Sequence, residues 1–226
     1  MPIHRHFDDE LFGLQVSLVH MAGIAEKMLR LAVREVTDRN ENLSGELRNL
    51  EKRVNELHIE IDETAIRLLA LHQPVASDLR LLVMSAKISS EIERIADQAV
   101  NISESGHYLL QHPPVGSMVD ISALTRRVEV MVWDSVDAYV RKDADLARQV
   151  LGLDAGVDEL NSKIFRDLIE FMKANPSQIQ PALALVLIAR NLEKIGDHAT
   201  NIAEEVITIV LGEDVRHRHE KGKRKG

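Results

Sequence analysis

The sequence is internally duplicated, and this constrains the fold more than any other feature of the chain. Three pairs of segments align between the halves: AEKMLRLAVREV from Ala25 with VEVMVWDSVDAYV from Val128, LEKRVNEL from Leu50 with LDAGVDEL from Leu153, and EIERIADQAVNISES from Glu91 with NLEKIGDHATNIAEE from Asn191. The first two pairs are offset by 103 residues and the third by 100 residues. A duplicated chain folds into two units of one kind, so the structure predicted for one half determines the architecture of the whole.

Each half is predicted to contain helices rather than strands, because its apolar residues recur every three or four positions. Helix breakers are few, and the six prolines stand at positions 2, 74, 113, 114, 176 and 181. We predict six helices, at about residues 8–38, 43–71, 76–110, 119–141, 144–174 and 179–211. We expect Asn42 or Ser44 to cap the second helix, and Asp143 to mark the break before the fifth. Long helices with short connections are typical of antiparallel bundles.

The predicted fold class is all-α, with two tandem three-helix bundles related by the internal duplication. The first bundle spans residues 1–112, a proline-rich linker spans 113–118, and the second bundle spans 119–212. Residues 213–226 contain six Lys or Arg against three Asp or Glu, and we expect them to form a basic, disordered tail.

The composition excludes several classes of function. The chain has no cysteine, which excludes disulfides, thiolate nucleophiles and cysteine-ligated zinc or iron–sulfur sites. Aromatic residues make up only 3% of the chain, which disfavours base-stacking surfaces. The net charge is −8, and the tail contributes +3, so the body carries −11. Such a body disfavours nucleic acid as a partner and suits a cation or a basic protein surface.

No membrane segment or signal peptide is evident in the sequence. No apolar run approaches the roughly 20 residues that a membrane-spanning helix needs. The opening residues, MPIHRHFDDE, do not have the pattern of a signal peptide. We therefore expect a soluble, cytoplasmic protein.

A stripe of polar residues recurs on the third helix of each half, opposite the apolar stripe. Four residue types are identical at the four equivalent positions: Glu93, Asp97, Asn101 and Glu104 in the first half, and Glu193, Asp197, Asn201 and Glu204 in the second. One interpretation is a solvated helix face. The other is a cation site, because carboxylate and amide oxygens spaced four residues apart are hard ligands on one face.

Two observations favour the cation site. Like charges four residues apart destabilise a helix by a few tenths of a kcal/mol, so a solvated face would usually interleave lysine. The stripe is also the same in both halves, whereas exposed positions elsewhere diverged, with Lys27 against Val130 and Arg34 against Asp137. We predict metal ligation by Glu93 and Asp97 in one bundle and by Glu193 and Asp197 in the other. Asn101 and Asn201 are weaker candidates.

At these residues the chain resembles the PhoU family of phosphate-uptake regulators. That family has two tandem three-helix repeats, each with a Glu/Asp-x-x-x-Asp motif on its third helix. Here the motifs read Glu93-Arg-Ile-Ala-Asp97 and Glu193-Lys-Ile-Gly-Asp197. Two further segments match, QPVASDLR from Gln73 and RNLEKIGDH ending at His198. The resemblance extends from about Phe7 to Gly212 and leaves the basic tail outside.

The resemblance implies a cytosolic negative regulator of the phosphate-starvation response that works by binding and not by catalysis. It implies that the motif carboxylates hold metal ions, including multinuclear iron clusters in some members; here iron, manganese, magnesium and zinc all stay open. The implied partners are the ATPase subunit of the phosphate transporter and a membrane sensor histidine kinase. We expect a homodimer that is peripheral to the membrane through these partners.

Two alternatives have a specific basis in the sequence. Glu104 and His107 form the Glu-x-x-His pattern of di-iron four-helix proteins, but position 207 is Ile207, so the second copy that this chemistry requires is missing. A structural helical spacer without metal would join its repeats by one continuous helix, which Pro113 and Pro114 oppose. No glycine-rich phosphate loop and no nucleophile with a neighbouring base stand out, so an enzyme is not expected.

Overall fold

The computed structural model describes residues 6–115, 121–213 and 215. Within these residues the chain forms six long α-helices and two short 3₁₀ turns. The helices are α1 (His6–Thr37), α2 (Ser44–His72), α3 (Ala76–Leu110), α4 (Ile121–Arg141), α5 (Ala144–Ala174) and α6 (Ile179–Leu211), and the turns are η1 (Glu41–Leu43) and η2 (Pro176–Gln178). The prediction of six helices is confirmed.

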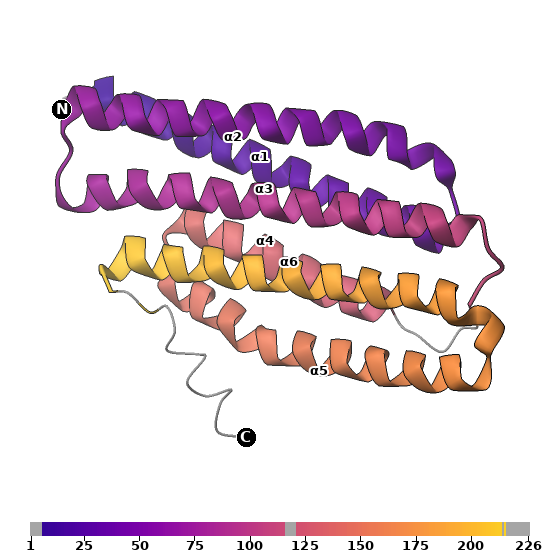
Figure 1. Ribbon diagram of the computed structural model, residues 1–226. Helices are drawn as coiled ribbons and strands as arrows, with labels where there is room; N and C mark the ends of the chain where they lie inside the picture. The colour runs from indigo at the N-terminus through magenta and orange to yellow at the C-terminus, as the bar shows by residue number, and fades with distance from the viewer. Residues whose placement is uncertain (1–5, 116–120, 214, 216–226) are drawn as a thin grey trace.

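The six helices form two three-helix bundles that lie against each other. Helices α1, α2 and α3 pack together in the first bundle, and α4, α5 and α6 in the second. The largest contact between any two helices joins α3 to α6, across the boundary between the bundles. Figure 1 shows α2, α3, α6 and α5 in one layer, with α1 and α4 side by side behind it. The predicted all-α fold with two tandem bundles is confirmed.

The apolar stripes of the third helices form the centre of both bundles. Each of their residues is at most 1% exposed: Ile88, Ile92, Ile95, Ala99 and Ile102 on α3, and Ile188, Leu192, Ile195, Ala199 and Ile202 on α6. Burying a large aliphatic side chain contributes about 1.5 to 3 kcal/mol, so these two stripes are a main source of stability. They also turn the polar stripes of the same helices toward the surface.

The predicted cap of the second helix was wrong. The side chain of Asn40 accepts a hydrogen bond from the backbone N–H of Asn42 and begins the turn η1. The hydroxyl of Ser44 donates to the carbonyl of Glu41, and the cap residue of α2 is Leu43, which makes no side-chain cap bond. The reason is that η1 runs directly into α2, so the capping takes place one turn earlier.

Asp143 lies at the predicted break and caps α5. Its carboxylate accepts hydrogen bonds from the backbone N–H groups of Asp145 and Leu146, both at 3.0 Å. These bonds satisfy two donors that the first turn of α5 would otherwise leave without a partner. At the other break, Pro113 and Pro114 follow the end of α3 in non-helical chain.

Parts of the predicted linker and tail lie outside the described residues. These are residues 116–118 of the linker, residues 119–120 at the start of the predicted second bundle, and residues 214 and 216–226 of the tail. Among the helices that the structure describes, none is long and apolar enough to cross a membrane.

One buried contact between helices is polar in the first repeat and apolar in the second. In the first repeat, Ser103 Oγ on α3 donates to Glu35 Oε2 on α1, and Glu35 is fully buried. The other oxygen, Glu35 Oε1, has no hydrogen-bond partner among the described residues. At the offsets of the duplication, the second repeat has Ala138 and Ala203 in these places, both fully buried. The first repeat therefore holds a carboxyl group where the second is entirely apolar.

Candidate functional site

The eight residues of the two polar stripes form what we call the carboxylate face. It comprises Glu93, Asp97, Asn101 and Glu104 on α3, and Glu193, Asp197, Asn201 and Glu204 on α6. None of the eight is buried: four are partly covered by neighbouring helices and four are exposed. The face belongs to the layer of α2, α3, α6 and α5 in Figure 1. It is open to solvent along its length, as a metal site on the surface of a bundle would have to be.

Glu91 links the two halves of the carboxylate face. Its Oε2 accepts a hydrogen bond from His198 Nδ1 at 2.8 Å and another from Asn201 Nδ2 at 2.9 Å, so α3 is tied to α6. Partial burial raises the pKa of the Glu91 carboxyl, but the two hydrogen bonds and nearby positive charge outweigh it and leave the pKa lowered. The amide of Asn201 is therefore already engaged by a side chain of the other repeat.

Glu93 and Asp97 lie close enough to influence each other. Burial raises the pKa of the Glu93 carboxyl, and the charge of Asp97 raises it further, against smaller opposing effects of His58 and Arg94. Burial also raises the pKa of Asp97, against Arg94 and His198. Each carboxylate is therefore less stable in its charged form than in water, and a bound cation would remove that penalty.

Helix α2 brings two further groups to this site. His58 Nε2 lies 3.4 Å from Ser90 Oγ and 3.4 Å from Asp62 Oδ2, and its charge acts on Glu93. From the sequence, Asp62 is interpreted as an ordinary surface charge, and His58 has no motif around it. No signal in the sequence places them here, because the register of α2 against α3 depends on packing between helices.

The second repeat arranges its carboxylates differently. Glu193 lines a groove of about 330 Å³ between α5 and α6, together with Asn161 and Phe165. Asn161 occupies the position equivalent to His58, at the offset of 103 residues. The first pair of carboxylates therefore has an imidazole near it, and the second pair has an amide.

The structure brings Glu93 and Asp97 close enough to act on each other, and it places Glu193 and Asp197 four residues apart on α6. Among the described residues, no group of three or more His, Asp or Glu side chains is arranged to hold one metal ion. The residues present are oxygen donors at four-residue spacing on an open face, which suits hard cations that keep water among their ligands. The donor set fits a surface-bound cation and does not form a closed cage. Asn101 contacts only Gln98, at 3.5 Å, among the hydrogen bonds described.

Comparison with known proteins points to one family. The family model described as PhoU domain matches residues 18–106 and 121–206. A relative from Pseudomonas aeruginosa, named phosphate-specific transport system accessory protein PhoU homolog, is 37% identical over 217 residues, covering 95% of this chain and 89% of the relative. The Escherichia coli K12 phosphate-specific transport system accessory protein PhoU is 33% identical over 217 residues, with the same coverage.

Solved structures of similar proteins have the same fold. The crystal structure of PhoU from Pseudomonas aeruginosa matches with a TM-score of 0.88 at 35% identity, covering 92% of this chain and all of the other. The crystal structure of the phosphate transport system regulatory protein PhoU from Streptococcus pneumoniae matches with a TM-score of 0.86 at 23% identity, covering 93% and 99% of the two chains. The second match shows only that the two proteins share a fold.

Proposed function

The chain belongs to the PhoU family, and from this premise we propose that it is a negative regulator of phosphate uptake and of the phosphate-starvation response. Its relatives are named as accessory proteins of the phosphate-specific transport system, which supports a role in regulating phosphate transport. We infer that it acts in the cytoplasm by binding other proteins and not by catalysis. The observation that carries the proposal is the match to both repeats over nearly the whole chain.

The proposed partners are the ATPase subunit of the phosphate transporter and the sensor histidine kinase that reads the state of that transporter. We propose that the protein is a homodimer and reaches the membrane only through these partners. An acidic body attracts basic partner surfaces and speeds their association. The alternative of a rod-like spacer has little support, because α3 ends at Leu110 and the two bundles lie side by side instead of end to end.

The test is reporter expression from a phosphate-starvation promoter in a deletion strain grown with plentiful phosphate. We expect the reporter to stay on in the deletion strain and to be repressed again by the wild-type gene. Charge reversal at Glu193 and Asp197 should weaken repression if the carboxylate face or its metal takes part in docking. Normal repression in the deletion strain, with no second copy of the gene, would contradict the regulatory role.

We also propose that the carboxylate face binds metal ions, one site on each repeat. Glu93 and Asp97 ligate in the first, Glu193 and Asp197 in the second, and Asn101 and Asn201 contribute weakly or through water. The raised pKa values of Glu93 and Asp97 support this, because two carboxylates held together gain from a cation. Iron, manganese, magnesium and zinc are the candidate ions.

Metal analysis of protein purified without added ions tests this proposal. Replacing Glu93 and Asp97 by Ala should remove about half of the bound metal and leave helicity intact. A matched control replaces Glu56 and Glu60, which have the same four-residue spacing on α2, are exposed and pair with Arg53 of their own helix. Unchanged metal content after all four ligands are replaced, or equal loss in the control, would contradict the assignment.

A further inference from the structure

A second candidate site lies in the layer of α1 and α4, behind the layer that carries the carboxylate face. A cavity of about 420 Å³ opens there between the two helices. Its polar and aromatic lining consists of Glu26, Arg30, Arg126, Glu129, Trp133 and Asp134. The lining thus includes three carboxyl groups and two guanidinium groups, a formal charge of −1.

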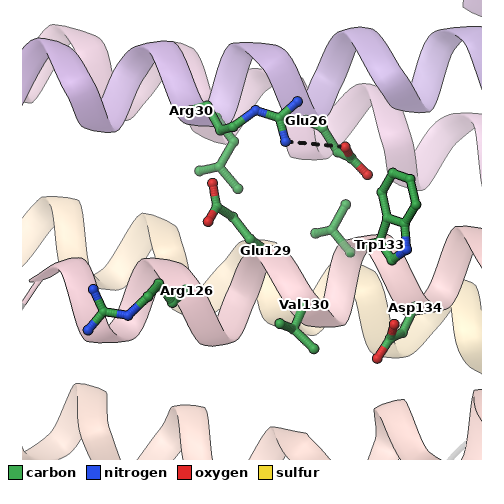
Figure 2. Close-up of a pocket in the computed structure, with 9 residues that line it drawn as sticks. Glu26, Arg30, Arg126, Glu129, Val130, Trp133 and Asp134 are labelled. Carbon is green, nitrogen blue, oxygen red and sulfur yellow. Dashed lines mark hydrogen bonds and ion pairs between the residues drawn. The ribbon is translucent and has the colours of Figure 1, made fainter.

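The duplication places equivalent carboxylates on the two sides of this cavity. Glu26 on α1 and Glu129 on α4 are related by the offset of 103 residues. Figure 2 shows the Glu129 carboxylate directed from α4 toward α1. Glu26 is only 8% exposed. Burial raises the pKa of Glu26, Arg30 partly offsets this, and the charge of Glu129 raises it again, so the two acids repel each other.

Among the described residues, only one of these two carboxylates is bonded to an arginine. Arg30, four residues after Glu26, donates to it at 3.5 Å, as the dashed line in Figure 2 shows. The residue four positions after Glu129 is Trp133, which is the equivalent of Arg30 in the second repeat. Among the described residues, no hydrogen bond or ion pair joins Glu129 to another side chain. Arg126, three residues before Glu129 on α4, lines the same cavity without such a bond to the Glu129 carboxylate. The second repeat therefore has no arginine at the position of Arg30.

Trp133 supplies a surface on which a guanidinium group could stack. Its side chain rises from α4 toward α1 in Figure 2 and is 62% exposed. A guanidinium group is planar, so it can donate two hydrogen bonds to one carboxylate while its face lies against an indole ring. A lysine ammonium lacks both the fork and the flat face, so the combination of Glu129 and Trp133 favours arginine.

We propose that this cavity binds an arginine side chain of a partner protein, which donates to Glu129 and stacks on Trp133. The arginine takes the place that Arg30 has in the first repeat and balances the third carboxylate. The site is separate from the carboxylate face, and the proposal holds whether or not that face binds metal and whichever protein is the partner.

The test uses the full-length protein and a short peptide with a single arginine between glycine and serine residues. Trp133 is the only tryptophan of the chain, so one indole N–H resonance reports on the cavity even when binding is weak. We expect the arginine peptide to shift this resonance, and a peptide with citrulline, which has the same shape without the charge, to leave it unchanged. A lysine peptide should bind more weakly than the arginine peptide.

Variants then test the residues, with anisotropy of a dye-labelled peptide as the readout. Glu129→Gln should weaken binding about tenfold, since it removes a charged acceptor. Trp133→Arg restores the arginine of the first repeat and should abolish binding by filling the site. Glu170→Gln makes the same charge change at an exposed residue of α5 and should leave the affinity unchanged. Should Trp133→Arg fail to fold, Trp133→Gln replaces it, with weakened binding expected.

Four outcomes would overturn the proposal. Equal binding of the citrulline peptide would show that the charge is irrelevant, and equal binding of the lysine peptide would remove the assignment to arginine. Equal loss in Glu170→Gln and Glu129→Gln would show general attraction to an acidic body. Binding that occurs only after residues 213–226 are removed would assign the cavity to the basic tail of this chain instead of a partner.

Discussion

At the scale of single residues, Glu35 is a fully buried polar group in the core of the first bundle, with one of its oxygens without a partner among the described residues. A buried carboxyl group loses its hydration, and here only the hydroxyl of Ser103 replaces it, with Oε1 left without a partner among the described residues. The second repeat avoids this cost with Ala138 and Ala203. Equivalent buried positions therefore hold a polar pair of side chains in the first repeat and an apolar pair in the second.

Removing only the hydrogen-bond donor, Ser103, should destabilise the protein more than replacing both Ser103 and Glu35. We expect Ser103→Ala to lower the free energy of unfolding by about 1 to 3 kcal/mol, because the buried Glu35 then has no hydrogen bond at all. Adding Glu35→Leu should restore at least the wild-type value, since an apolar side chain of similar size replaces a buried polar one. Urea denaturation of the wild type, single and double variants measures this, and a double variant less stable than Ser103→Ala would contradict it.

The carboxylates of the first motif should lower stability in the absence of metal. The folded state raises the pKa of Glu93 and Asp97, so these groups favour folding most when both are protonated, and their cost appears as the pH rises through the folded pKa values. Glu93→Gln with Asp97→Asn should therefore raise the unfolding free energy of metal-free protein at pH 7. Both groups are only partly buried, so solvent screening limits the gain to no more than about 1 kcal/mol.

Thermal unfolding at several pH values measures how much the free energy of unfolding differs between the double variant and the wild type. It should shrink as the pH falls below the ordinary carboxyl pKa values, where both proteins are neutral at these positions. Added metal should stabilise the wild type more than the variant. A difference that grows toward low pH would contradict the expected sign.

At the scale of helices, the cap of α5 is the clearest local determinant. We expect Asp143→Ala to lower the free energy of unfolding by about 1 kcal/mol, because two backbone N–H groups lose their acceptor. Ser44→Ala is the control, since the Ser44 hydroxyl donates to the carbonyl of Glu41 and does not cap the start of α2. Chemical denaturation compares the two, and an equal loss in both variants would show that the cap bonds contribute little.

The limits of the helices were largely predictable from the sequence, because periodicity and helix breakers act locally. The predicted ranges 76–110, 144–174 and 179–211 agree with α3, α5 and α6 to the residue. The start of α2 was placed one residue early and its cap was assigned wrongly, because a 3₁₀ turn is too short to leave a periodic signal.

The surroundings of the carboxylate face could not be predicted from local patterns. The motif residues themselves stand out through the duplication, since the same four residue types recur on α6. The bond from His198 to Glu91 joins residues 107 positions apart in different repeats, and His58 reaches the face from α2. Such neighbours depend on how one helix crosses another, and the period of each helix alone contains no information about this.

At the scale of the whole molecule, the helices pack extensively against each other across the boundary between the repeats as well as within each repeat. The contact of α3 with α6 is larger than any helix contact within either bundle. Buried polar bonds cross the boundary as well, such as the one between the hydroxyl groups of Ser85 on α3 and Tyr139 on α4, at 2.7 Å. Either repeat alone would expose this surface to water.

We therefore expect the two repeats to unfold together, in one transition. Trp133 lies on α4 at the boundary with α1 and reports on that boundary, whereas circular dichroism at about 222 nm reports helix in both repeats. Urea titrations followed by the two signals should coincide if the chain unfolds in one cooperative step. Separate midpoints would show that the repeats are independent domains. A fragment of residues 119–212 should unfold at lower urea concentration than the intact chain.

The cavity between α1 and α4 illustrates an advantage of encoding both halves of a symmetric arrangement in one chain. In a pair of identical subunits, every substitution appears twice, once on each side of the axis. Here a change such as arginine to tryptophan appears on one side only, beside Glu129, while Arg30 stays beside Glu26. Covalent linkage thus frees each copy to specialise, so one half can keep its internal balance of charge while the other gives it up to recognise another molecule.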